Sequence, residues 1–131
     1  MKRPRTIINK IDKSRLTPYV QSAWDNSPTA RLRKTLELAE AVPPNAVPPD
    51  VVTMNSRVAI RYPEDDDVEV YTLSYPYEDV GRGLPVLSPL GSAILAACEG
   101  DRVDFMGARH SRSVIIEVIQ YQPERVGRFD L

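Results

Sequence analysis

Two spacings of hydrophobic residues divide this chain. Up to about residue 42, apolar side chains recur every three or four positions, whereas beyond residue 57 they alternate with polar ones. The first spacing is typical of amphipathic helices and the second of half-buried strands. The pattern therefore predicts an α+β protein in which the helices come first and a sheet follows.

The first apolar stripe is preceded by a short β-prone segment, Thr6 to Ile8. The stripe itself consists of Leu16, Tyr19, Val20 and Ala23. Pro18 would remove a hydrogen bond from the interior of a helix, so we expect the helix to begin near Ser14 or Thr17, with Asp12 as a candidate cap.

A second helix is expected to begin at Ser27-Pro28, because serine is a good N-cap and proline fits the first helical position. Its stripe consists of Leu32, Leu36 and Ala39, broadened by Leu38 and Val42. A turn at residues 24–28 would join the two helices into a short antiparallel hairpin, in which each helix depends on the other for stability. A second arm of roughly 14 residues would reach only about 20 Å.

Residues 41–50 contain four prolines and cannot continue a helix. They predict a stiff linker, because proline favours extended backbone. We therefore expect two domains, residues 1–48 with the hairpin and linker and residues 49–131 with the sheet. The proline spacing also matches a PxxP ligand, but a linker is the simpler interpretation.

The alternating pattern of residues 49–131 predicts about five antiparallel strands packed on one helix. The expected strands are 58–62, 68–75, 86–87, 102–105 and 114–121. The helix begins at an N-cap, Ser88, followed by Pro89, and we expect it to end at Gly100. Cys98 would lie on its apolar stripe, and Val103 and Phe105 on the buried face of the next strand.

Two motifs carry a resemblance to a known family. Ser-Pro-Leu-Gly-Ser-Ala-Ile-Leu at 88–95, followed by Glu-Gly-Asp-Arg-Val at 99–103, resembles the signature of the C-terminal domain of the bacterial Gre transcript-cleavage factors, which is FKBP-like. Further matches lie at 6–9, 49–58 and 121–129. Together they resemble a Gre-related family, the regulators of nucleoside diphosphate kinase, which bind RNA polymerase. The likeness is dense from about Pro49 onward.

The resemblance implies that the hairpin matters for function. Gre factors carry a far longer coiled coil, which enters the polymerase secondary channel and presents clustered acids to the catalytic metal. Magnesium requires several oxygen ligands, yet the turn offers only Asp25. Three cations follow it, Arg31, Arg33 and Lys34. The resemblance therefore implies a non-catalytic regulator that binds the polymerase near this channel and competes with Gre factors without transcript cleavage.

The candidate partner-binding residues form two groups. The hairpin tip comprises Trp24, Asp25, Arg31, Arg33 and Lys34. The second group is Ser88, Pro89 and Gly91, which match the family motif and are expected to lie near the docking surface. A plainer interpretation of the tip remains open, in which its cations are surface charges and Arg33 pairs with Glu37 one turn later.

Composition excludes several other classes. With a formal net charge of −1, binding of nucleic acid through the overall field is not expected. One cysteine excludes an internal disulfide, and one histidine, His110, lacks companion metal ligands. The acids at 64–67 lack the calcium-loop pattern and predict an exposed turn. We expect no metal, no cofactor and no membrane span, and a cytoplasmic monomer.

Two alternatives remain for function. A direct protein-interaction or nucleotide-sensing role on nucleoside diphosphate kinase is the first, and the sequence offers no phosphate-binding loop for it. A peptidyl-prolyl isomerase is the second, prompted only by the fold type, which is a weak guide to activity. No nucleophile and base are placed together by the sequence, so we expect no enzyme.

Overall fold

A computed structural model describes residues 6–21, 28–76, 83–107 and 109–128, and the structural statements below concern these residues. Trp24 and Asp25 lie outside them. The helices are α1 (Lys10–Val20), α2 (Pro28–Leu38) and α3 (Pro89–Ile94), with two 3₁₀ turns at Pro44–Ala46 and Glu124–Val126. The strands are β1 (Ile7–Asn9), β2 (Glu40–Val42), β3 (Arg57–Tyr62), β4 (Asp67–Ser74), β5 (Leu84–Pro85), β6 (Arg102–Met106) and β7 (Ser111–Tyr121).

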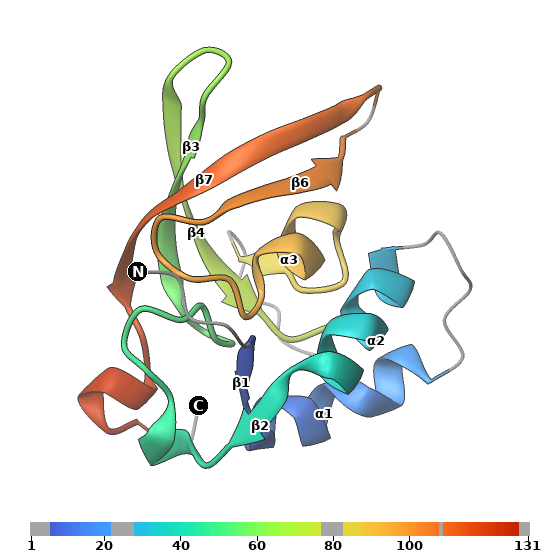
Figure 1. The fold of residues 1–131 in the computed structure, drawn as a ribbon, viewed down its shortest axis with the longest axis vertical. Helices are drawn as coiled ribbons and strands as arrows, with labels where there is room; N and C mark the ends of the chain where they lie inside the picture. Colours follow the sequence, from blue (N-terminus) through green and yellow to red (C-terminus); the bar gives the residue numbers. More distant parts are fainter. Residues whose placement is uncertain (1–5, 22–27, 77–82, 108, 129–131) are drawn as a thin grey trace.

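The predicted helical pair is confirmed, because α1 and α2 lie side by side (Figure 1). Leu16 and Val20 of α1 and Leu32 and Leu36 of α2 are buried. The predicted stripes are wrong at two positions, because Tyr19 and Leu38 are exposed. Each helix has 11 residues, which corresponds to about 16 Å at 1.5 Å per residue.

Helix α1 begins at Lys10, several residues before the predicted start. Asn9 is the N-cap, because its side-chain oxygen accepts a hydrogen bond from the Ile11 amide at 2.9 Å. Pro18 therefore lies inside the helix, close to its C-terminal end. Asp12 is not a cap and is instead buried within α1.

The β-prone segment before α1 forms β1, which pairs in parallel with β2. Glu40 and Ala41 of β2 lie opposite Ile7 and Ile8. The proline-rich segment is thus more than a linker, since its first residues belong to this two-stranded sheet and Pro44–Ala46 form a 3₁₀ turn. The start and the end of the helical pair are tied together by backbone hydrogen bonds.

The larger sheet has the predicted five strands, in the order β5-β4-β3-β7-β6. It is mixed and not wholly antiparallel, because β5 pairs in parallel with β4. The strand expected at 86–87 lies two residues earlier, at Leu84–Pro85, where Pro85 lies opposite Ser74. β7 starts at Ser111, and the exposed Val118 shows that its outer face is not covered.

Helix α3 ends at Ile94, six residues before the predicted stop at Gly100. The chain leaves the helix because Ala96 adopts a φ of 70° and its amide donates to the Val52 carbonyl, while the Ala97 carbonyl accepts from the Val52 amide. Cys98 consequently lies outside the helix, where it is half-buried and forms a bridge with Val51.

One hydrophobic core serves both parts of the chain. It lies between the sheet and α3 and continues to the two long helices, and α3 stands between the sheet and α2 in Figure 1. Leu16 and Leu32 belong to the same cluster as Ile60, Ile94 and Ile116. Val103 and Phe105 pack against it, as predicted. The division into domains at residues 48 and 49 stays a prediction.

Candidate functional site

The cations of the predicted hairpin tip lie on α2, whose first turn contains no acidic residue. Although they are close in sequence, they face different sides of the helix. Arg33 lines a hollow between α1 and α2, whereas Arg31 and Lys34 line a second hollow on the other side of α2. The structure therefore does not gather them into one patch.

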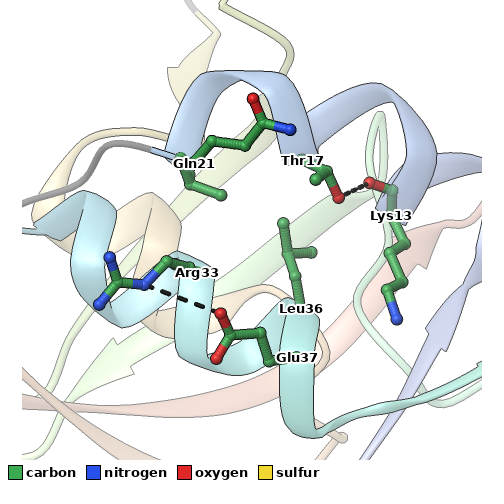
Figure 2. Close-up of a pocket in the computed structure, with 7 residues that line it drawn as sticks. Lys13, Thr17, Gln21, Arg33, Leu36 and Glu37 are labelled. Atoms are coloured by element: carbon green, nitrogen blue, oxygen red, sulfur yellow. Dashed lines mark hydrogen bonds and ion pairs between the residues drawn. The ribbon is translucent and has the colours of Figure 1, made fainter.

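The hollow between α1 and α2 has a volume of about 390 Å³ and is the pocket drawn in Figure 2. Arg33 forms the expected pair with Glu37, with 3.9 Å between Nε and Oε1. Lys13, Thr17 and Gln21 line it from α1. The Thr17 hydroxyl donates to the Lys13 carbonyl at 2.7 Å, so it is already engaged within the helix.

Arg31 links the helical pair to the sheet. Its guanidinium donates a hydrogen bond to the carbonyl oxygen of Asp104 on β6. Lys34 lies one turn further along α2 and is exposed. Together with four other residues they line the second hollow, of about 220 Å³, which is described further below.

The family-motif residues build the start of α3. The Ser88 hydroxyl accepts from the Gly91 amide at 3.1 Å and donates to the Pro85 carbonyl at 2.6 Å, which confirms Ser88 as the N-cap. Gly91 is buried, and a Cβ at this position would lie 2.1 Å from the Pro85 carbonyl oxygen. Ser88 and Gly91 therefore have structural roles, whereas Pro89 is exposed at the surface.

A buried polar cluster links four distant segments of the chain and has no counterpart among the predicted sites. Glu124 accepts from the side-chain amide of Asn9 at 2.6 Å and from the Thr53 hydroxyl at 2.7 Å. Asp12 accepts from the Tyr75 hydroxyl at 2.8 Å and from the Met54 amide at 3.1 Å. These bonds span 42 to 115 positions in sequence, so no local pattern could have identified them.

Burial dominates the electrostatics of this cluster. Asp12 is 1% exposed, and burial raises its pKa to about 7, although the hydrogen bonds from Tyr75 and Met54 oppose the rise. The nearby Glu124 carboxylate raises it further and Arg15 lowers it. Burial and the neighbouring Asp12 carboxylate likewise raise the pKa of Tyr75. The cluster binds the start of α1 to the second half of the chain.

The described part of the chain was predicted from the sequence to lack a cluster of metal-ligating side chains. No three His, Cys, Asp or Glu side chains there are grouped so that they could hold a metal ion. Glu64, Asp65 and Asp66 lie in the exposed turn between β3 and β4, as predicted, whereas Asp67 is the first residue of β4. Asp66 contacts Arg61 at 3.4 Å. His110 is exposed. None of the described helices combines the length and apolar character needed to span a membrane.

The second part of the chain matches a known protein family. Residues 47–121 match the family model of the C-terminal domain of the transcription elongation factors GreA and GreB. The chain belongs to the GreA/GreB family. The match covers the sheet, α3 and the Ser88 cap, so the resemblance stated from the motifs is confirmed, and the second part of the chain has the FKBP-like fold of Gre factors.

Two bacterial proteins resemble this GreA/GreB-family protein along almost its whole length. The chain is 37% identical over 135 residues to the regulator of nucleoside diphosphate kinase of Escherichia coli K12. The alignment covers 98% of each of the two chains. The Shigella flexneri protein of the same name gives the same values. The chain is thus a homologue of this regulator along almost its whole length.

Solved structures show the same architecture. A GreA/GreB elongation factor from Nitrosomonas europaea superposes with a TM-score of 0.72 and 30% identity, covering 91% of this chain and all of that one. Thermus aquaticus Gfh1 superposes with a TM-score of 0.51 at 13% identity, over 91% of this chain and all of that one, and shows the likeness of fold alone.

Proposed function

We propose that this GreA/GreB-family protein is a non-catalytic transcription regulator that binds RNA polymerase near its secondary channel. It competes there with Gre-type cleavage factors and has no transcript-cleavage activity of its own. Family membership and the homology to the regulator of nucleoside diphosphate kinase support association with the polymerase. The observation that carries the non-catalytic role is the short and basic second arm of the helical pair, α2.

Delivery of a metal ion to a distant reaction centre would require a long arm with at least two free carboxylates near its tip. Each helix of the described pair is only about 16 Å long. Of its carboxylates, Asp12 is buried beside Tyr75 and Glu37 pairs with Arg33. Asp25 is the single acid that the sequence offers between the two helices, and it lies outside the described residues.

In this proposal the two groups of predicted residues act at different points of contact. The cations of α2, together with Trp24 and Asp25 of the turn predicted from the sequence, meet the channel entrance. The surface around Ser88, Pro89 and Gly91 supplies the docking neighbourhood of the second part of the chain. The protein acts as a cytoplasmic monomer without a cofactor.

The test uses the purified full chain and RNA polymerase core enzyme. The protein should co-migrate with the polymerase in gel filtration and should reduce Gre-stimulated transcript cleavage as its concentration rises. It should not stimulate cleavage when added alone. Absence of competition at a large excess over the Gre factor would refute the proposal.

A triple charge reversal separates the hairpin from general electrostatics. Changing Arg31, Arg33 and Lys34 to glutamate should weaken competition while circular dichroism shows an intact fold. The matched control reverses three exposed cations elsewhere, Arg57, Arg102 and Arg109. Equal losses in both variants would mean that α2 has no specific role.

A second function is suggested by the name of the homologues, which is regulation of nucleoside diphosphate kinase. This effect would be either a consequence of transcription or a direct contact with the kinase. A pull-down of purified kinase with the full chain, with and without nucleotide, distinguishes the two. Retention of the kinase in the absence of polymerase would favour direct contact.

A further inference from the structure

The outer side of α2 carries a hollow of about 220 Å³ with an unusual combination of side chains. Its lining residues are Thr6, Arg31, Lys34, Thr35, Leu38 and Ala39. Four of them lie three or four positions apart and so share one face of the helix. The six lining residues together provide two cations and two hydroxyl groups, and no carboxylate is among them.

Leu38 gives this hollow an apolar component. Its side chain is 79% exposed, the highest value among the exposed large hydrophobic residues of the described chain. A single exposed leucine needs no explanation by itself. Here, however, it lies one turn from Lys34, beside a hollow, so the surface combines positive charge with an apolar contact in one place.

The hollow between α1 and α2 provides an internal comparison. It also contains cations, but Arg33 is paired with Glu37 and Leu36 is only 2% exposed. That side of the helix therefore has a partly neutralised charge and a covered apolar residue. On the outer side of α2 no carboxylate lies among the lining residues, and Leu38 is exposed although Ala39 is buried.

Arg31 remains able to bind a ligand although it contacts β6. Its Nη1 donates to the Asp104 carbonyl, and a guanidinium has five N–H donors in total. The bond to Asp104 also fixes the side chain at the edge of the hollow. A fixed guanidinium loses less side-chain entropy when it binds a carboxylate.

We propose that this hollow binds a short acidic segment of a protein partner. In this arrangement carboxylates of the segment contact Lys34 and Arg31, the two threonine hydroxyls accept or donate hydrogen bonds at the rim, and one apolar side chain covers Leu38. A nucleic acid would satisfy the cations but would leave Leu38 uncovered. The observations therefore favour a peptide that is both acidic and apolar over a phosphate backbone.

The inference rests on the proposed function only for the identity of the partner, because a polymerase subunit could supply the acidic segment. The binding test accordingly uses a synthetic probe. Fluorescence anisotropy measures binding of the full chain to a labelled peptide, Glu-Asp-Leu-Phe-Glu-Asp. A second peptide replaces its two apolar residues by serine, and a single-stranded oligonucleotide is the third probe.

We expect saturable binding of the acidic–apolar peptide that weakens as salt concentration rises. Lys34→Glu should weaken it about ten-fold and Leu38→Ala about five-fold, because each removes one of the two contact types. The matched control, Lys13→Glu, makes the same charge change on the other side of the helical pair and should alter binding less than about two-fold. All three positions are on the surface or partly so, and circular dichroism checks the fold.

Three results would overturn the inference. Equal weakening by Lys34→Glu and Lys13→Glu would indicate non-specific charge attraction. Equal affinity for the serine peptide would remove the role of Leu38, and tighter binding of the oligonucleotide would make this a nucleic-acid surface. Peptide binding without co-migration with polymerase would refute the proposed function alone, whereas co-migration without peptide binding would refute this inference alone.

Discussion

Replacing Asp12 by asparagine should remove most of the pH dependence of folding stability in this protein. The Asp12 carboxyl is buried under Tyr75 and Met54, and its pKa is raised from 3.8 to about 7 by burial. Because the folded state holds this proton more tightly than the unfolded state, the contribution of Asp12 to stability is highest below pH 4. It falls as the pH rises toward 7 and is constant above that.

The size of the effect follows from the shift. At 1.36 kcal/mol per pKa unit, a rise from 3.8 to about 7 corresponds to about 4 kcal/mol in total. About 3 kcal/mol of this falls between pH 5 and pH 8. Asparagine cannot ionise, and it can still accept from the Met54 amide while its amide group faces the Tyr75 hydroxyl. Asp12→Asn should therefore be more stable than the native chain at pH 8.

Urea denaturation followed by circular dichroism at several pH values between 5 and 8 measures this. The native chain should lose stability across this range and Asp12→Asn should lose much less. Asp67→Asn, at an exposed position at the start of β4, is the control and should leave the native profile unchanged. An unchanged pH profile in Asp12→Asn would refute the assignment of the raised pKa to this carboxyl.

Three substitutions test the packing. Gly91→Ala places a Cβ 2.1 Å from the Pro85 carbonyl and should lower the free energy of unfolding by about 2 kcal/mol or more, measured by urea denaturation. Ser88→Ala removes the cap of α3 and should cost about 1 kcal/mol in the same assay, so a cost as large as that of Gly91→Ala would contradict a simple capping role. Leu32→Ala opens a cavity in the shared core and should cost roughly 2–5 kcal/mol. Its thermal transition, recorded by near- and far-ultraviolet circular dichroism, should stay single, and separate melting of helices and sheet would contradict one shared core.

Local signals in the sequence were sufficient for much of this fold. The Ser88 cap followed by proline identified the start of α3, and the alternation of Val58, Ile60 and Tyr62 identified β3. The stripe of Leu32 and Leu36 identified the buried side of α2. Each of these features depends on neighbours within a few positions, which is why spacing alone predicted them.

The errors arose where distant segments meet. Helix α3 ends early because Ala96 and Ala97 form backbone hydrogen bonds with Val52, about 45 positions away. No sequence signal near Ile94 indicates this ending. Asp12 has the chemistry of a cap, yet its partners Met54 and Tyr75 lie 42 and 63 positions further along. Parallel pairing of β5 with β4 is equally invisible in the alternation pattern.

One feature of the candidate site was open to prediction from helix geometry. Residues two positions apart do not share a face of a helix, whereas residues three or four apart do. Helix geometry therefore requires Arg33 to face a different side of α2 from Arg31 and Lys34. The exposure of Leu38 was not predictable in this way, because it depends on which side of α2 meets the core.

The helical pair gains its stability from the rest of the molecule. Helices of 11 residues are marginal by themselves in water, so α1 and α2 depend on the core that they share with α3 and the sheet. Three further ties hold them: the β1–β2 pair, the buried bonds of Asp12, and the contact of Arg31 with Asp104. An arm held in this way is already ordered before it meets a partner. Binding then avoids much of the entropy cost of ordering these helices, which is consistent with the proposed role in binding a partner.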